Sequence, residues 1–358
     1  MKNQGYGSLR AYASKKSKCL VFLLMGVAFT CWAEWNRGEY ADMVGELFFT
    51  ARSAALSGAD LAVSHTGPLL YNPGNLARTG ARGLSVTYAD LYKSLFSASM
   101  LHYTTAVNSN AGVGVSMAYL HIPGIEYTRH LDTEHIVIDD LELFSSSDVW
   151  IRVGYGYKLN IGKTDIYYGA AFNARRRRLH KWTGYGIGID GGVVADHAVG
   201  ELGALENLYV SAGLMVENIT GSYHHWSSYY KEYSLPHLRF SMAFQFDWDV
   251  PLPGEVLFAF TSPDLLSNEG INQTGSDEED DPEQISFRQQ PFAIFRNGKI
   301  GLEYKVLNTL ALRGGLDKGD FSMGAGLSFF DNTVSTDFTY ITHQLAGTWK
   351  ISVTYDWH

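Results

Sequence analysis

The chain has 358 residues and a formal net charge of −9, and 18% of its residues are charged, against roughly 25% in a typical soluble domain. The negative charge argues against nucleic acid as a general partner. Both cysteines, Cys19 and Cys31, precede the predicted mature chain, which therefore has no disulfide, thiolate metal site or cysteine nucleophile. With 22 Tyr, 19 Phe and 37 Gly, the composition favours strands that are polar on one face and apolar on the other.

The first predicted element is an export signal over residues 1–33. A basic patch with Lys15, Lys16 and Lys18 precedes the apolar run CLVFLLMGVAFT, and CWA then offers a small residue for cleavage. This run is shorter than the roughly 20 residues of a membrane-spanning helix. A retained anchor and a lipoprotein at Cys31 are the alternatives, and the preceding Phe-Thr pair lacks the small residue that a lipoprotein cleavage site needs.

Residues 34–80 separate this signal from the first predicted strand. The run ARSAALSGADLAV is rich in small residues and predicts a helix or a compact turn region. The run LLYNPGNLA, at 69–77, then breaks the chain, because Pro73 fixes φ and Gly74 leaves the next position free. An ordinary turn before the first strand is the plain alternative for this break.

The remainder alternates with the period of β-strands. In LRFSMAFQFDWD, one face carries only large apolar residues, which are Leu238, Phe240, Met242, Phe244, Phe246 and Trp248, while polar and small residues fill the other face. The apolar face could point to the core of a soluble sandwich or to lipid around a barrel. Strands of about ten residues, with aromatics near their ends, favour an outer-membrane barrel whose polar faces line the lumen.

Fourteen strands are predicted, an even number, as bacterial barrels require. They lie near 83–91, 95–104, 111–121, 148–159, 164–174, 184–196, 206–219, 237–249, 254–262, 299–307, 309–317, 320–330, 332–341 and 347–357. The connections alternate between short turns such as NIGK and PLPG and the long segments 122–147, 220–236 and 263–298. Short periplasmic turns and long external loops are typical of such barrels. The fold class is therefore an all-β, 14-stranded antiparallel transmembrane barrel over 81–358, and the economical place for the apolar segment 34–80 is inside it as a plug.

The sequence of residues 51–77 resembles the N-terminal hatch signature of the FadL-type outer-membrane transporters of long-chain fatty acids and their relatives, including PorV-like proteins of a secretion system. The matching positions are Ala51, Arg52, Ala54, Gly58, Ala59, Ala62, Val63, Leu70, Asn72, Pro73, Leu76 and Ala77. Gly74 stands where the family usually has alanine, and SHTG at 64–67 stands where it usually has acidic residues. The resemblance implies a fourteen-stranded barrel plugged by a hatch, with a hydrophobic ligand entering from outside.

The candidate site residues follow from this interpretation. Arg52, Gly58, Asn72, Pro73 and Gly74 are the hatch motif. Arg152, Arg239 and Lys350 are predicted to face the lumen, where they could receive a carboxylate. The alternative is a structural lattice of ion pairs with residues such as Glu217, Glu303 and Asp337.

Two external loops are further candidates for contact with a ligand or lipid. RRRRLHKW at 175–182 carries Arg175, Arg176, Arg177, Arg178 and Trp182, and SYHHWSSYYKEY at 222–233 carries Trp226. Solvated loops are the alternative, as for the acidic run at 277–283. Adjacent histidines point to opposite sides of an extended chain, so no metal site is predicted at His224 and His225. No spacing singles out a nucleophile and its base, so no catalytic residue, enzyme activity or cofactor is predicted.

The leading functional hypothesis is uptake of long-chain fatty acids or similar hydrophobic molecules across the bacterial outer membrane, by a barrel that acts as a monomer embedded in outer-membrane lipid. The second hypothesis is a non-transporting scaffold or surface-exposed binding protein like the secretion-associated relatives. It rests on the long, charged and aromatic external loops.

Overall fold

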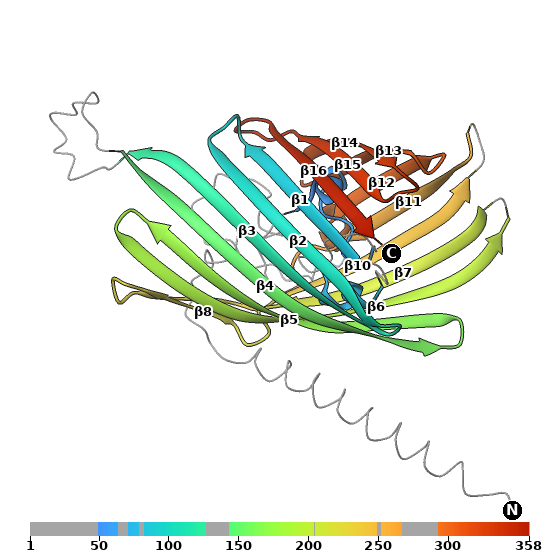
Figure 1. The fold of residues 1–358 in the computed structure, drawn as a ribbon, viewed down its shortest axis with the longest axis horizontal. Coiled ribbons are helices and arrows are strands. Elements are labelled where there is room, and N and C mark those ends of the chain that lie inside the picture. Colours follow the sequence, from blue (N-terminus) through green and yellow to red (C-terminus); the bar gives the residue numbers. More distant parts are fainter. Residues whose placement is uncertain are drawn as a thin grey trace, which may run out of the picture. The chain divides into compact units, whose positions relative to one another are not determined.

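A computed structural model describes the barrel strands and two stretches that precede them (Figure 1). It describes residues 49–63, 71–78, 82–126, 143–203, 205–248, 252–266 and 293–357. The predicted signal peptide, residues 34–48, the SHTG run at 64–67 and the acidic run at 277–283 lie outside the described residues. Within the described ranges, no helix is both long and apolar enough to cross a membrane.

Strands dominate the described part of the chain, and its helices are short. The helices are α2 Ala51–Ala55, η3 Pro73–Ala77 and α3 Ala293–Arg296. The strands are β1 Arg82–Leu91, β2 Phe96–Asn108, β3 Ala111–Glu126, β4 Leu143–Ile161, β5 Thr164–Leu179, β6 Trp182–Leu202, β7 Leu205–Glu217, β8 Ser222–Trp226, β9 Lys231–Ser234, β10 His237–Trp248, β11 Gly254–Thr261, β12 Lys299–Val306, β13 Leu310–Asp317, β14 Asp320–Phe329, β15 Val334–Ile341 and β16 Thr348–Trp357.

The described strands form one antiparallel sheet that closes on itself. Of its sixteen strands, β8 and β9 are a hairpin attached to β6, and the other fourteen form a ring. The ring closes where β1 pairs with β16, from Arg82 opposite Trp357 to Asp90 opposite Trp349. Closure leaves no open sheet edge in the bilayer, where unpaired backbone groups would be costly. The prediction of fourteen barrel strands is confirmed.

The two faces of the wall have reversed polarity relative to a soluble protein. In β1, Ser85 and Thr87 are buried, whereas Leu84, Val86 and Tyr88, which alternate with them along the strand, are exposed. The same alternation follows the ring, and the buried positions between exposed large apolar residues are mostly small or polar. An apolar outer face is stable only against lipid, so the chain is a transmembrane β-barrel with a polar lumen.

The strands of the ring differ in length. β4 and β6 have 19 and 21 residues, whereas β11, β12 and β13 have 8 each. A tilted strand needs about 9–11 residues to cross the bilayer, so β4 and β6 extend beyond it. We call the end of the barrel with the turns at 162–163 and 307–309 the short-turn end, and the opposite end, where β3 and β11 end and β4 and β12 begin, the long-loop end.

Both predicted external loops contain strand. β5 continues to Leu179, so the four arginines that were placed in a loop lie on a strand. Residues 222–233 were also predicted as a loop, but most of them form the hairpin of β8 and β9. In both cases the polar and aromatic composition of the segment led to the prediction of a loop. A strand that continues past the bilayer also carries such residues.

The described residues before β1 pack on the lumen side of the wall. We call residues 49–63 and 71–78 the inner segment. Its helix α2 contacts β13–β16, and its short helix η3 contacts β2–β6. Most of its side chains are buried, with Ala51, Leu56 and Asn72 among those fully enclosed. The inner segment therefore bridges opposite parts of the ring.

Candidate functional site

The Asn72-Pro73-Gly74 stretch begins η3 and is fixed to the wall by its own backbone and side chains. The Asn72 side-chain oxygen accepts a hydrogen bond from the Gly74 amide at 2.9 Å, which caps the helix. The Asn72 amide nitrogen donates to the backbone carbonyls of Val193 at 3.4 Å and Leu214 at 3.3 Å. Pro73 occupies the first helical position, where its missing N–H costs nothing.

A straight row of four glycines in the wall receives this turn. We call Gly112, Gly156, Gly169 and Gly192 the glycine row, because they are paired in register across β3, β4, β5 and β6. A Cβ at Gly156 would lie 2.9 Å from the Pro73 oxygen, and one at Gly169 or Gly192 would overlap Pro73 or Asn72. The row lets the backbone of η3 approach the backbone of the wall, which side chains would prevent.

A second set of contacts joins the two halves of the inner segment. The Asn75 amide donates to the carbonyls of Leu61 at 3.1 Å and Val63 at 3.3 Å. Arg78 donates to the Ala62 carbonyl at 2.6 Å and pairs with Asp196 of β6 at 2.8 Å. Residues 61–63 and 71–78 are thus held together and to β6.

Hydroxyl groups of the opposite wall hold the other half of the inner segment. Ser352 accepts from the Ala51 amide at 2.8 Å, Ser322 donates to the Ala55 carbonyl at 2.9 Å, and Thr261 donates to the Ala59 carbonyl at 2.9 Å. The lumen-facing serines and threonines of the barrel therefore satisfy backbone groups of α2 and its continuation, which are too short to satisfy themselves.

Arg52 adds an ion pair to this contact. Its guanidinium donates two hydrogen bonds to the Glu303 carboxylate, at 2.8 and 2.9 Å. Glu303 also pairs with Arg313, which pairs with Asp337 at 2.7 Å. Burial alone would lower the pKa of Arg52, but the charge of Glu303 and its hydrogen bonds outweigh burial and raise that pKa. The network fixes α2 to β12, β13 and β15.

Gly58 completes the hatch motif at a backbone turn. Its φ is +71°, and a Cβ there would lie 2.5 Å from the ring of Phe49. Phe49 in turn stacks on Tyr71 with ring centroids 5.1 Å apart. The Tyr71 hydroxyl accepts from the Thr50 amide at 2.7 Å, and burial together with the charge of Asp60 raises the pKa of Tyr71. All five predicted hatch residues thus lie within one packed segment.

Two of the three predicted lumen cations lie in ion pairs. Arg152 is buried and contacts Asp190 at 2.5 Å and Glu217 at 3.7 Å, and Arg239 lies 3.6 Å from the same Glu217. Lys350 is buried and donates to the Phe49 carbonyl at 3.3 Å. These contacts correspond to the ion-pair alternative for Arg152 and Arg239, and a role of the three cations in ligand binding stays a prediction.

The four consecutive arginines of β5 divide between the two faces of the wall. Arg175 is buried and donates to both oxygens of Asp148, at 2.9 and 3.0 Å through its Nε, and Arg177 contacts the same carboxylate at 3.2 Å. Arg176 and Arg178 are exposed on the opposite face. The Asp148 carboxylate of β4 therefore forms ion pairs with both lumen-facing arginines.

The two predicted tryptophans also differ. Trp182 is exposed at the start of β6, with the Lys181 ammonium 5.2 Å from its ring centre. Trp226 is buried in β8. Its ring packs on Gly184 so closely that a Cβ added there would lie only 2.8 Å from it. Trp226 therefore packs the hairpin of β8 and β9 against β6, a structural contact.

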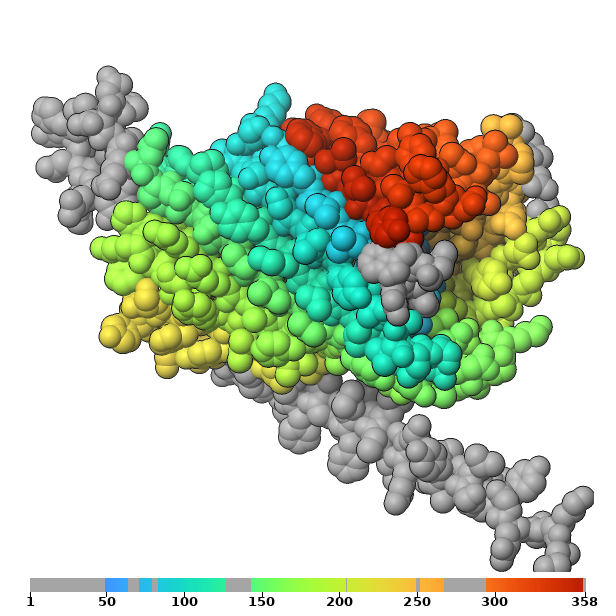
Figure 2. All heavy atoms as spheres, viewed as in Figure 1, coloured from blue at the N-terminus to red at the C-terminus, as the bar shows by residue number. Residues whose placement is uncertain are grey.

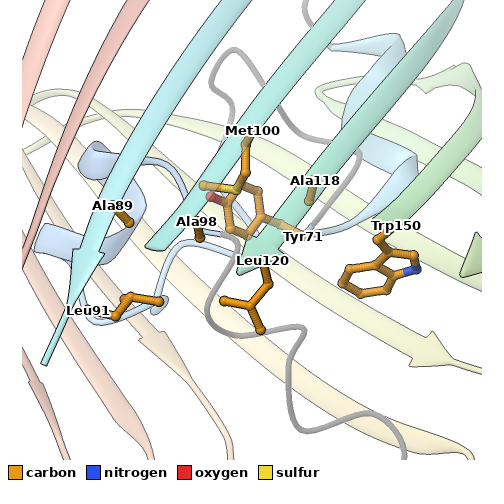
Figure 3. Close-up of a cluster of buried hydrophobic side chains, with 8 residues drawn as sticks. All are labelled: Tyr71, Ala89, Leu91, Ala98, Met100, Ala118, Leu120 and Trp150. Carbon is orange, nitrogen blue, oxygen red and sulfur yellow. The ribbon is translucent and has the colours of Figure 1, made fainter. Parts of the chain in front are cut away.

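A lumen-facing apolar cluster lies at the long-loop half of the wall, around Tyr71 of the inner segment. Its residues are Tyr71, Ala89, Leu91, Ala98, Met100, Ala118, Leu120 and Trp150, which we call the apolar cluster. Figure 3 shows the Tyr71 ring among Met100, Ala98 and Leu120, with Trp150 to one side. The guanidinium of Arg152 lies 4.7 Å from the Trp150 ring centre, so a cation adjoins the apolar surface.

A polar cavity of about 290 Å³ lies on the other side of α2, toward the short-turn end. Residues of the inner segment and of β10–β16 line it, including Arg52, Glu255, Glu303, Arg313 and Asp356. Along the barrel the order is therefore apolar cluster, inner segment, polar cavity. In the described ranges, no group of three or more His, Cys, Asp or Glu side chains is arranged to hold a metal ion.

Several of these residues had no individual signal in the sequence. The glycine row, Asp196 and the apolar cluster were missed, because alternation assigns a residue to a face but does not say what packs on it. Glycine at alternate positions, as in VGYGYK and GYGIGID, was a usable sign of close backbone approach.

Removing the Asn72 side chain should loosen the inner segment. Asn72→Ala loses the cap of η3 and both hydrogen bonds to the wall, and we expect a loss of about 1–2 kcal/mol in the free energy of unfolding. Urea unfolding of the detergent-solubilised barrel, followed by tryptophan fluorescence, measures this loss. The matched substitution Asn110→Ala, in the exposed β2–β3 turn, should change it by less than about 0.5 kcal/mol, and equal losses for both variants would contradict the proposed contact.

Comparisons with known proteins give fold-level similarity. No family model and no curated protein matches the chain. Among solved structures, the toluene transporter TodX of Pseudomonas putida is 12% identical, with 86% of this chain and 97% of that chain covered and a TM-score of 0.48. A FadL homologue of Pseudomonas aeruginosa is 10% identical, with 84% and 96% covered and a TM-score of 0.43. The KdgM porin is 8% identical, with 77% and 99% covered and a TM-score of 0.32. By the pairing of its own strands the chain is a closed fourteen-stranded transmembrane β-barrel, and the structures similar to it include a FadL homologue.

Proposed function

We propose that the chain is an outer-membrane transporter of hydrophobic small molecules and that the inner segment is its hatch. The carrying observation is the position of Tyr71, which belongs to the inner segment and packs within the lumen-facing apolar cluster. A ligand bound at the cluster would contact the hatch directly. Binding would then be coupled to the position of the hatch, because the ligand and Tyr71 would share the same apolar surface.

The order of surfaces along the barrel supports a route for such a molecule. A hydrophobic ligand gains about 0.8 kcal/mol for each CH₂ group it buries, which the apolar cluster at the long-loop end could supply. Beyond α2 the polar cavity offers no comparable surface, since charged residues line much of it. A ligand that passes the inner segment would therefore bind only weakly in the polar cavity, from which it would dissociate readily toward the short-turn end.

We further propose long-chain fatty acids as the ligand class, in keeping with the resemblance of the 51–77 sequence to the fatty acid transporters. Trp150 lies near two cations, with the guanidinium carbons of Arg152 and Arg175 at 4.7 and 5.8 Å from its ring centre. A carboxylate near these arginines would place its acyl chain on the apolar cluster. Both arginines already pair with aspartates, so the carboxylate would share them, and a neutral ligand of the same length is the comparison to make.

A binding experiment with neighbouring substitutions tests the proposal. Leu120 is buried in the apolar cluster, whereas Tyr119 beside it is exposed on the outer face. Leu120→Gln should weaken binding of oleate to the purified barrel by about tenfold, because a buried leucine contributes roughly 1.5–3 kcal/mol of apolar contact. Tyr119→Gln should leave binding unchanged. Titration of a fluorescent fatty acid, displaced by oleate, measures both.

The outcomes separate the general from the specific proposal. Equal displacement by oleate and oleyl alcohol would retain a hydrophobic ligand but reject carboxylate recognition. No saturable binding of either compound to the folded protein would reject transport of acyl molecules. Binding that Leu120→Gln and Tyr119→Gln weaken equally would reject the apolar cluster as the site.

A further inference from the structure

The arginine run of β5 presents two cations to the outside of the barrel. Successive side chains of a strand point to opposite faces, so Arg176 and Arg178 lie on the face opposite to the Asp148 contacts of Arg175 and Arg177. Both side chains are exposed. The Arg176 side chain has no hydrogen-bond or ion-pair partner among the described residues, and a structural ion pair therefore does not explain it.

The register of the strands places these arginines in rows across the outer face. Two apolar rows come first, toward the middle of the wall: Val115, Val153, Phe172 and Ile189, then Met117, Ile151, Ala174, Ile187, Tyr223 and Tyr233. The next two rows toward the long-loop end are Tyr119, Val149, Arg176, Tyr185, His225 and Lys231, then His121, Ser147, Arg178 and Thr183. We call these last two the basic rows.

The change between these rows marks the edge of the hydrocarbon layer. The apolar rows contain no ionisable group other than tyrosine, whereas the basic rows contain Arg176, Arg178 and Lys231. An arginine on the lipid face costs about 2–4 kcal/mol at the midplane and nearly nothing at the interface. The basic rows also contain no aspartate or glutamate. They therefore lie at the level of the lipid headgroups and carry uncompensated positive charge.

We propose that the basic rows bind the phosphate groups of lipids in the leaflet at the long-loop end. An arginine fork matches the oxygens of a phosphate and donates two hydrogen bonds to it. Arg176 and Arg178 are two residues apart on one face, about 7 Å along the strand, so they can contact two phosphates of one lipid or of neighbouring lipids. Tyr119 and Tyr185 flank them with amphipathic rings suited to the interface. In Figure 2 the atoms of β3–β5, the strands that carry Tyr119, Val149 and Arg176, form one continuous surface.

A lipid-retention measurement tests this assignment. The wild-type barrel is placed in phosphatidylcholine nanodiscs that contain a small fraction of bisphosphorylated lipid A, and bound lipid is quantified by native mass spectrometry after release into mild detergent. Arg176→Gln/Arg178→Gln should weaken lipid A retention by about tenfold or more, because each basic residue near an anionic surface adds to the attraction. Lipid A without its phosphates should be retained weakly by every variant.

A matched control removes two cations at the same end of the barrel. Lys93 and Lys318 are exposed in the turns after β1 and β13, away from the basic rows, and Lys93→Asn/Lys318→Asn should leave retention near the wild-type value. Equal losses in the two double variants would show a general charge effect and overturn the proposal, as would undiminished retention in the arginine variant. If that variant does not fold, the wild type still decides, since retention that does not fall at high salt would also overturn it.

Discussion

Replacing Glu303 with glutamine should detach α2 from the wall and lower the free energy of unfolding by roughly 3 kcal/mol. Arg52 would lose both of its hydrogen bonds to a carboxylate, while Arg313 would retain Asp337. Removing one partner of a buried pair leaves the other charge uncompensated, at a cost of about 3–5 kcal/mol. We take the lower end, because 21% of the Arg52 side chain is exposed and water can reach it.

Glu255 provides the control for this substitution. It lines the same polar cavity, and the described residues offer it no ion pair, so Glu255→Gln removes the same charge from the same space without orphaning a cation. We expect a change below about 1 kcal/mol. Urea unfolding gives the free energies, and hydrogen exchange of the amides of Ala51–Ala55 reports on detachment. Indistinguishable values for the two glutamine variants would show that Arg52 does not depend on Glu303.

A double variant separates an orphaned charge from lost packing. In Arg52→Gln/Glu303→Gln the uncompensated guanidinium is absent, so much of the stability lost in Glu303→Gln should return. If the double variant is as unstable as the sum of the two single variants, the ion pair is not what holds α2. The neutral contacts of α2 with Ser352 and Ser322 would remain in the double variant. We therefore expect α2 to stay on the wall in this variant, as a hatch held by several contacts should.

The fold could be predicted from the sequence to a large extent, because a membrane barrel repeats one simple constraint. Each crossing must alternate, as in Leu238 to Trp248, and must end at a turn, so a period of two and turn residues locate every strand. The prediction erred where strands continue past the bilayer. Beyond that boundary Arg175–Leu179 and Ser222–Trp226 need no apolar face, and composition no longer distinguishes a strand from a loop.

The candidate site was less predictable, because it depends on which residues meet across the lumen. The motif residue Arg52 could be singled out, but nothing local identifies Glu303, 251 residues away, as its partner. Nor does anything local identify Asp196 as the partner of Arg78. Likewise alternation places Arg152 in the lumen but does not show that Asp190 lies within 2.5 Å. Such pairings follow from the shear of the closed ring, which sequence periodicity does not encode.

The second large effect is expected from a substitution in the glycine row, which contacts the Asn72-Pro73-Gly74 stretch of the hatch motif. Gly169→Ala would place a methyl group against the Pro73 carbonyl and the Tyr155 carbonyl. Both are backbone atoms and cannot rotate away, so we expect a loss of about 1–3 kcal/mol or displacement of η3 from the wall. Displacement would open a path beside the hatch, and the conductance of the barrel in planar bilayers should rise several-fold over the wild type.

A strand glycine with free space serves as the comparison for Gly169. At Gly314 in β13, the nearest atom to an added Cβ is the Ser322 carbonyl oxygen at 3.9 Å. Gly314→Ala should therefore keep the wild-type conductance and slightly raise stability, because alanine restricts the unfolded chain. If Gly169→Ala also keeps both values, η3 does not depend on close backbone approach. If Gly169→Ala loses stability without a rise in conductance, the row anchors a structural element, and the hatch role of η3 would have to be abandoned.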